Sequence, residues 1–276
     1  MAKGKKTTAS VTVPFYDYLR SFYRLNRGQI RFSYKDLSKR ILDYNDPDNS
    51  GSFFRKPQFE AFEMYVFLKE YLDNPRLSDL LEDFRANRGK FDLKNSAAPG
   101  QQDLFCNIDT AAYEGTLKRL EAVRQDYANY IFALTMGVGK TILMATCIFY
   151  EFLLARKFPD DDRFCANAIV FAPDTTVLES LREIVTFDKT KVLPPEYARS
   201  LDADIKFYFL DESGVTLNTL DRSSFNVAIS NTQKIILKRR HAEKTAQEKL
   251  FSPLSARYSM DEDPNADLYA AGLASD

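Results

Sequence analysis

The residues best suited to chemistry in this sequence lie in one short run, Thr135-Met136-Gly137-Val138-Gly139-Lys140-Thr141. Two glycines let a backbone bend so that several N–H groups converge on phosphate oxygens. A lysine ammonium that follows them adds a cation for the phosphates, and a threonine hydroxyl is a ligand for Mg²⁺. The run therefore predicts a binding site for ATP and Mg²⁺, in which Lys140 and Thr141 are the catalytic candidates and Thr141 holds the metal.

The segments on either side of this run fit the same interpretation. Residues 130–134 are apolar and of strand type, and residues 142–158 are apolar with helical spacing. Strand, glycine loop and helix in this order are typical of a phosphate-binding loop, with the positive end of the new helix directed at the phosphates. The longer form of the motif has glycine at position 134, where this chain has leucine, so only the shorter form Gly-x-Gly-Lys-Thr is present. A tight turn with a surface lysine is the alternative.

The composition describes an ordinary folded protein and excludes several classes. The chain has 276 residues, of which 45% are hydrophobic and 28% are charged, and its net charge is −1. It therefore has no overall basic field, and any contact with DNA must come from local patches. The three cysteines (Cys106, Cys147 and Cys165) are widely spaced, and His241 is the single histidine. This pattern argues against a zinc site, a disulfide framework and a histidine-based triad.

No secretory signal and no apolar run long enough to cross a bilayer is present, so we expect a cytoplasmic protein. Composition and order of segments divide the chain into four parts. We expect an N-terminal helical region at 1–53, a helix and helical insertion at 54–129, an ATP-binding domain at 130–251, and a poorly structured tail at 252–276. Residues 235–249, the most cationic stretch, predict a basic helix with a solvated or phosphate-binding face.

Gln58 is a second candidate for nucleotide binding. It lies in Arg55-Lys56-Pro57-Gln58-Phe59-Glu60-Ala61, at the start of an apolar helical pattern that ends before Asp73-Asn74-Pro75. A glutamine amide carries one acceptor and one donor group, so it can pair with both N6 and N7 of adenine and select ATP over GTP. Taken alone, Gln58 is an ordinary residue at a helix start. Upstream of a phosphate-binding loop, it is better interpreted as an adenine-reading residue.

Further strands and polar turns follow the loop. Residues 168–173 form an apolar strand pattern that ends at Pro173, and Thr175 lies at the start of the next helix pattern. Residues 205–210 are a second strand pattern followed by Asp211-Glu212, and residues 225–230 are a third that continues to Thr232-Gln233. Parallel strands joined by helices predict an α/β fold.

The order of these motifs resembles the first motor domain of superfamily-two DEAD/DEAH-type helicases. Within that group the chain looks most like the ATPase (Res) subunit of type III restriction enzymes. The resemblance implies a RecA-like P-loop sheet flanked by helices, incomplete here and preceded by a helical N-terminal region. It implies ATP and Mg²⁺ bound by Gln58 and residues 135–141, and a double-stranded DNA backbone contacted by Pro173, Thr175, Thr232 and Gln233.

Two features of the family are not found in the printed sequence. Asp-Glu-x-His does not follow the last strand, and there is no second motor domain with an arginine finger. We therefore interpret the chain as a truncated part of a helicase or translocase that binds ATP but does not hydrolyse it alone. Its expected partners are the missing C-terminal motor domain and a modification or specificity subunit. DNA specificity and an attached nuclease are not encoded in the motifs.

Two other interpretations remain open. In the first, the chain is a self-contained P-loop ATPase or kinase in which Asp211 binds Mg²⁺ through water and Glu212 orients the attacking water. In the second, it is a non-enzymatic interaction module with a decayed loop. The three interpretations differ in whether the chain binds ATP and whether it hydrolyses ATP without DNA.

Overall fold

The computed structural model describes residues 15–86, 88–91, 110–172, 175–210 and 225–231. In this part of the chain the N-terminal region is helical, as expected. It contains α1 (Phe15–Ser33), α2 (Asp36–Asn45), α3 (Lys56–Val66), the π-helix η1 (Phe67–Tyr71), α4 (Leu77–Arg85), the 3-10 turn η2 (Gly89–Phe91) and α6 (Thr110–Ala122). In α1 the buried residues Leu19, Phe22, Tyr23 and Ile30 recur at helical spacing, so one face is turned to the core.

The C-terminal part is of mixed α/β type. It contains α7 (Lys140–Lys157), β1 (Asn167–Ala172), α8 (Thr175–Thr186), the 3-10 turn η3 (Lys189–Lys191), α9 (Pro195–Asp204), β2 (Ile205–Phe209) and β3 (Phe225–Asn231). The three strands match the apolar runs predicted from the sequence. The turn η3 and the helix α9 were not predicted. Pro195 occupies the first turn of α9, where its missing N–H group is not needed.

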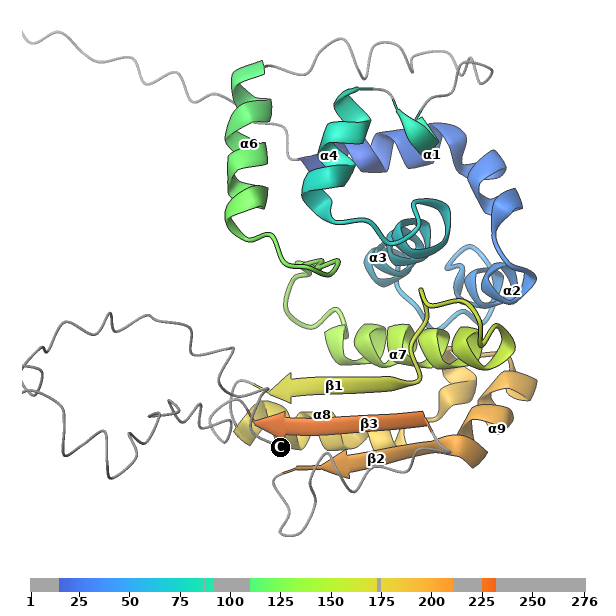
Figure 1. Ribbon diagram of the computed structural model, residues 1–276. Coiled ribbons are helices and arrows are strands. Elements are labelled where there is room, and N and C mark those ends of the chain that lie inside the picture. The colour runs from blue at the N-terminus through green and yellow to red at the C-terminus, as the bar shows by residue number, and fades with distance from the viewer. Residues whose placement is uncertain (1–14, 87, 92–109, 173–174, 211–224, 232–276) are drawn as a thin grey trace, which may run out of the picture.

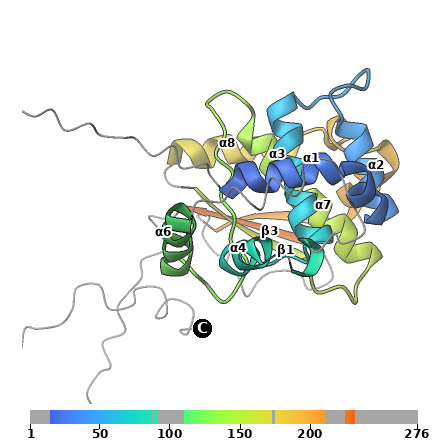
Figure 2. The ribbon, with the colours of Figure 1, turned by 90° about the horizontal axis from the view of Figure 1, so that it is seen from above.

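The strands form a parallel sheet in the order β1-β3-β2. Asn167 pairs with Asn226 and Ala172 with Asn231 on one side of β3, and Phe209 pairs with Ile229 on the other. Helix α8 packs on β1 and β3, and α7 lies between the sheet and the N-terminal helices (Figure 1). In the view from above, α1, α3 and α4 lie nearer to the viewer than the strands (Figure 2).

One hydrophobic cluster joins these elements. It extends from Leu19 in α1 to Ile229 in β3 and includes Phe62 of α3 and Phe149 and Tyr150 of α7, all three fully buried. Phe62 and Tyr150 meet edge to face at 5.6 Å between ring centroids. The N-terminal helices, α7 and the sheet therefore share one core. Among the described helices we find none with the length and apolar character needed to span a membrane.

One element differs from the sequence prediction. Residues 130–134 were expected to form the strand before the glycine loop, but they form no strand and pair with none of the three described strands. The Tyr130 hydroxyl instead donates a hydrogen bond to the carbonyl of Pro75 at 2.6 Å, and Phe132 packs on Tyr65 of α3 at 6.1 Å between ring centroids. These side-chain contacts hold the segment on the helical region, and Ile131 is left 94% exposed.

Candidate nucleotide-binding site

The glycine loop leads directly into the long helix α7. Gly137 and Gly139 have φ angles of +75° and +80°, in the left-handed region that side chains disfavour. Gly139 is the N-cap residue of α7 and provides no side-chain cap, and the first intrahelical bond runs from the N–H of Leu143 to the carbonyl of Gly139 at 3.1 Å. The N–H groups ahead of Leu143 therefore have no partner within the helix, which makes this end favourable for an anion.

The polar side chains of the loop are free to bind a ligand. Lys140 is exposed and Thr141 is half-buried, and neither makes a side-chain hydrogen bond or ion pair with the residues that the structure describes. Thr135 and Met136 are exposed, and Val138 is half-buried. Because no carboxylate of the described residues pairs with the Lys140 ammonium, its charge could meet a phosphate.

The start of α3, which lies about 80 residues before the glycine loop in the sequence, is hydrogen-bonded to this loop. Gln58 is 3% exposed, its Oε1 accepts a hydrogen bond from the N–H of Arg55 at 3.0 Å, and its Nε2 donates to the carbonyl of Gly139 at 3.2 Å. The Arg55 guanidinium donates to the carbonyl of Gly137 at 3.3 Å. Both contacts take up loop carbonyls, so they attach the loop to the start of α3.

The position of Gln58 bears on its expected role. Its amide already uses one donor and one acceptor within the protein, so the structure gives it a loop-supporting contact that the sequence did not predict. The remaining N–H and lone pair are the groups that could meet an adenine. Adenine recognition by Gln58 stays a prediction. Contacts between residues so far apart in the chain leave no signal in local spacing, which is why this one was missed.

A largely apolar pocket of about 420 Å³ lies next to the loop. Lys140 and Thr141 contribute to its wall, together with Phe132 and Leu134 of the segment 130–134. The opposite wall is formed by β1 and α8, including Phe171 and Val177. Cys147 of α7 also borders it, and burial raises the pKa of its thiol well above its ordinary value, so this cysteine is an apolar lining group and not a nucleophile.

The expected DNA-contacting residues are only partly described. Pro173, Thr232 and Gln233 lie outside the described residues, as do Asp211 and Glu212, and Thr175 is seen as the first residue of α8. Ala172 and Asn231, the last residues of β1 and β3, pair with each other, so the two strands end on the same side of the sheet. The N-terminal end of α7 lies toward these carboxyl ends of the strands in Figure 1. Among the described residues, no group of three or more His, Cys, Asp or Glu side chains is placed to share a metal ion.

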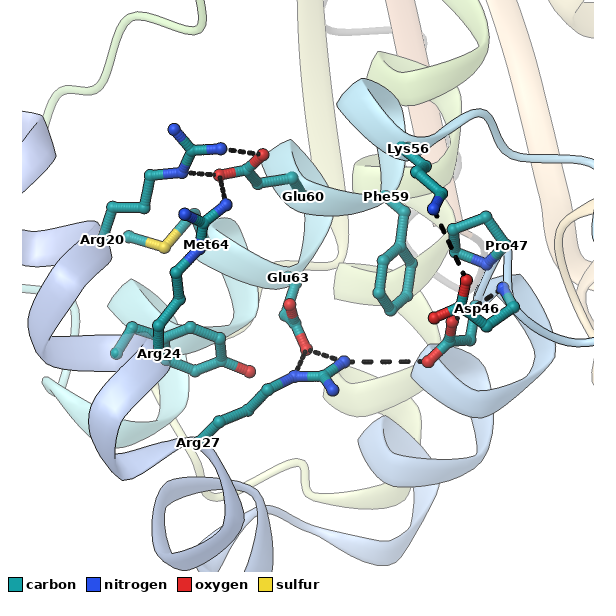
Figure 3. A pocket seen from close by; sticks show the side chains of 12 residues that line it. Arg20, Arg24, Arg27, Asp46, Pro47, Lys56, Phe59, Glu60, Glu63 and Met64 are labelled. Atoms are coloured by element: carbon teal, nitrogen blue, oxygen red, sulfur yellow. Dashed lines mark hydrogen bonds and ion pairs between the residues drawn. The ribbon is translucent and has the colours of Figure 1, made fainter.

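A second, charged pocket of about 320 Å³ lies between α1 and α3 (Figure 3). Arg20 and Arg24 reach Glu60, and Arg27 pairs with Glu63 at 2.8 Å. The spacing of these arginines along one face of α1 is the sequence signal that could have predicted the cluster. Its cations and carboxylates neutralise one another, so we assign it to the attachment of α1 to α3.

Comparison of the chain with family models, with curated proteins and with solved structures found no match in any of the three. The functional argument therefore depends on the geometry of the loop and its surroundings.

Proposed function

We propose that this chain binds ATP with Mg²⁺ through residues 135–141 and the N-terminal end of α7. The observation that carries the proposal is the start of an 18-residue helix without a side-chain cap, preceded by two left-handed glycines and beginning with Lys140, which has no ion pair among the described residues. N–H groups, the positive helix end and the Lys140 ammonium would then act on the β- and γ-phosphates together. The Thr141 hydroxyl would be a ligand for Mg²⁺, whose charge neutralises the triphosphate.

The proposal extends to a RecA-like motor domain that acts in a DNA helicase or translocase of the type III restriction kind. Support comes from the parallel sheet, from the polar residues that follow β1 and β3 in the sequence, and from Gln58 lying against the glycine loop. In such a motor the DNA backbone crosses the polar turns while ATP binds at the loop. The chain alone would hold ATP, and turnover would need the acidic motif and the second motor domain.

Titration with a fluorescent ATP analogue tests the loop directly. We expect saturable binding by the wild type in the presence of Mg²⁺, and at least tenfold weaker binding by Lys140→Ala, which corresponds to about 1.4 kcal/mol. Lys157→Ala is the matched control, because Lys157 is an exposed lysine at the opposite end of the same helix. Equal affinities of the two variants would refute phosphate binding at this loop.

An ATPase assay with and without double-stranded DNA separates the remaining interpretations. Our proposal expects ATP binding with no turnover by the chain alone. Hydrolysis that is independent of DNA and is lost in Glu212→Gln would instead favour a self-contained ATPase. Absence of ATP binding by the wild type would favour an interaction module.

A further inference from the structure

Gln58 joins the start of α3 to the start of α7 through a single amide group. Its Oε1 accepts a hydrogen bond from the N–H of Arg55, the N-cap residue of α3, at 3.0 Å. A glutamine at the third position of a helix commonly satisfies a free N–H group at the helix start in this way. Its Nε2 donates to the carbonyl of Gly139, the N-cap residue of α7, at 3.2 Å. Each end of the amide therefore serves one helix start.

The bond to Gly139 restricts the most adaptable part of the loop. The carbonyl of Gly139 also accepts the first intrahelical bond of α7, from the N–H of Leu143 at 3.1 Å. Glycine has the widest choice of backbone conformations, so it has the most freedom to lose when a ligand fixes it. A side-chain bond removes part of that freedom before the ligand arrives. Such preorganisation raises affinity, because less ordering remains to be done on binding.

The packing of Gln58 leaves little room for a base. The residue is 3% exposed, and a Cβ on Gly139 would lie 2.7 Å from its Nε2, so the amide is packed directly against the loop backbone. A base that pairs with both amide atoms must lie edge to edge with them. The remaining N–H and lone pair of the amide lie below the surface at which a base would arrive.

We infer that Gln58 is a positioning residue of the glycine loop, which acts on the triphosphate of a bound nucleotide through Gly139 and does not read the base. This role rests on the proposed binding of a triphosphate by residues 135–141, and it differs from the adenine contact that the family resemblance implies. Affinity then depends on Gln58 to the same extent for every ligand that carries a triphosphate, whether its base is adenine or guanine or is missing.

Displacement of the fluorescent ATP analogue by ATP, by GTP and by inorganic tripolyphosphate, each with Mg²⁺, measures this dependence. Gln58→Met removes both hydrogen bonds and keeps an unbranched, adaptable side chain. We expect it to weaken binding of all three ligands by the same factor, about threefold to tenfold, which is the effect of one hydrogen bond on an equilibrium. Gln125→Met is the matched control, because Gln125 is an exposed glutamine outside α3 and the loop, and it should leave all three affinities unchanged.

Hydrogen exchange in the ligand-free protein separates this role from a general loss of structure. Without the bond from Gln58, the first turn of α7 should open more often. The amide of Leu143, which is bonded to Gly139, should therefore exchange at least about threefold faster in Gln58→Met. The amide of Leu153, near the other end of the same helix, should exchange at the wild-type rate. Equal acceleration of both amides would mean that the substitution loosens the whole fold, and would overturn the inference.

The ligand series separates the remaining outcomes. A loss confined to ATP in Gln58→Met, with GTP and tripolyphosphate unaffected, would show that Gln58 reads adenine. Unchanged binding of all three ligands would show that its bond to Gly139 contributes nothing to binding. Either result overturns the positioning role and leaves the phosphate site at residues 135–141 in place. No binding of any of the three ligands by the wild type would refute the proposed function and the positioning role together.

Discussion

At the scale of single residues, Gly139 is subject to two separate constraints. Its φ of +80° disfavours any side chain, and a Cβ placed there would lie 2.7 Å from Nε2 of Gln58. Gln58 cannot withdraw without cost, because its amide is hydrogen-bonded to Arg55 and to Gly139 itself. Gly137 has a similar φ of +75° but nothing within 4 Å of a Cβ. A side chain at position 137 would therefore meet backbone strain alone, whereas one at position 139 would meet both backbone strain and a steric conflict.

We predict that Gly137→Ala lowers the free energy of unfolding by about 1–2 kcal/mol, the cost of a left-handed residue with a side chain. Gly139→Ala should cost roughly 1–2 kcal/mol more, because it also breaks the hydrogen bonds of Gln58. Urea denaturation of the two variants, of Gln58→Ala and of the double variant Gly139→Ala/Gln58→Ala measures the coupling. Additive effects in this cycle would show that the contact between the two residues contributes nothing.

At the scale of elements, a buried ion pair joins the π-helix η1 to α7. Lys69 Nζ lies 3.2 Å from Glu151 Oε1, with both side chains at most 10% exposed. The ammonium also donates to the carbonyl of Arg163, and Glu151 accepts from the Tyr65 hydroxyl and, at 3.3 Å, from the N–H of Cys165. These bonds compensate the loss of water around both charges and connect η1 and α7 with the segment before β1.

Removal of one partner should therefore be costly. We predict that Lys69→Met lowers the free energy of unfolding by about 3–5 kcal/mol, because Glu151 would remain buried without a cation. The double variant Lys69→Met/Glu151→Leu should recover much of that loss, since no unpaired charge then remains. Urea unfolding followed by circular dichroism measures both. A cost under about 1 kcal/mol for Lys69→Met would mean that water reaches the carboxylate.

The helices and strands differ in how well the sequence alone predicts them. Helical spacing predicted α3 and α7, and apolar runs predicted all three strands, because local periodicity carries that information. The prediction of a strand at 130–134 was wrong, although the composition of this segment is typical of a strand. Its fate depends on Tyr130 reaching Pro75 and Phe132 reaching Tyr65, contacts over more than 50 residues of sequence. The bond from Gln58 to the loop escaped prediction for the same reason.

At the scale of the whole molecule, one ionic cluster joins the N-terminal helices to the segment that leads into the sheet. Asp161 lies 2.8 Å from Nη2 of Arg163 and 3.0 Å from Nζ of Lys35 at the start of α2. Arg163 also reaches Asp73, just after η1, at 2.8 Å. Hydrogen bonds from Arg163 hold the pKa of the Asp161 carboxyl well below its ordinary value.

Because of this pKa shift, the free energy of unfolding depends on pH in the acid range. A carboxyl whose pKa is lowered by folding stabilises the protein at pH values above its unfolded pKa, which is about 3.9 for aspartate. As the pH falls from there toward the folded pKa, this contribution is lost, because the unfolded chain binds more protons than the folded one. At pH 7 we expect Asp161→Asn to cost roughly 1.5–3 kcal/mol, the range for hydrogen bonds to charged groups. Below about pH 4 the wild type should lose stability steeply and approach the variant.

Urea midpoints of wild type and Asp161→Asn between about pH 2 and pH 7 test this expectation, since the two curves should converge in acid. Asp162→Asn is the control, because Asp162 is the exposed neighbour and pairs with no cation among the described residues. Its curve should follow that of the wild type. Parallel curves for wild type and Asp161→Asn would mean that Asp161 protonates alike in folded and unfolded chains. The start of α2 would then be held at this junction by Lys35, whose Nζ lies 4.1 Å from the ring centroid of Phe158 and 5.8 Å from that of Phe164.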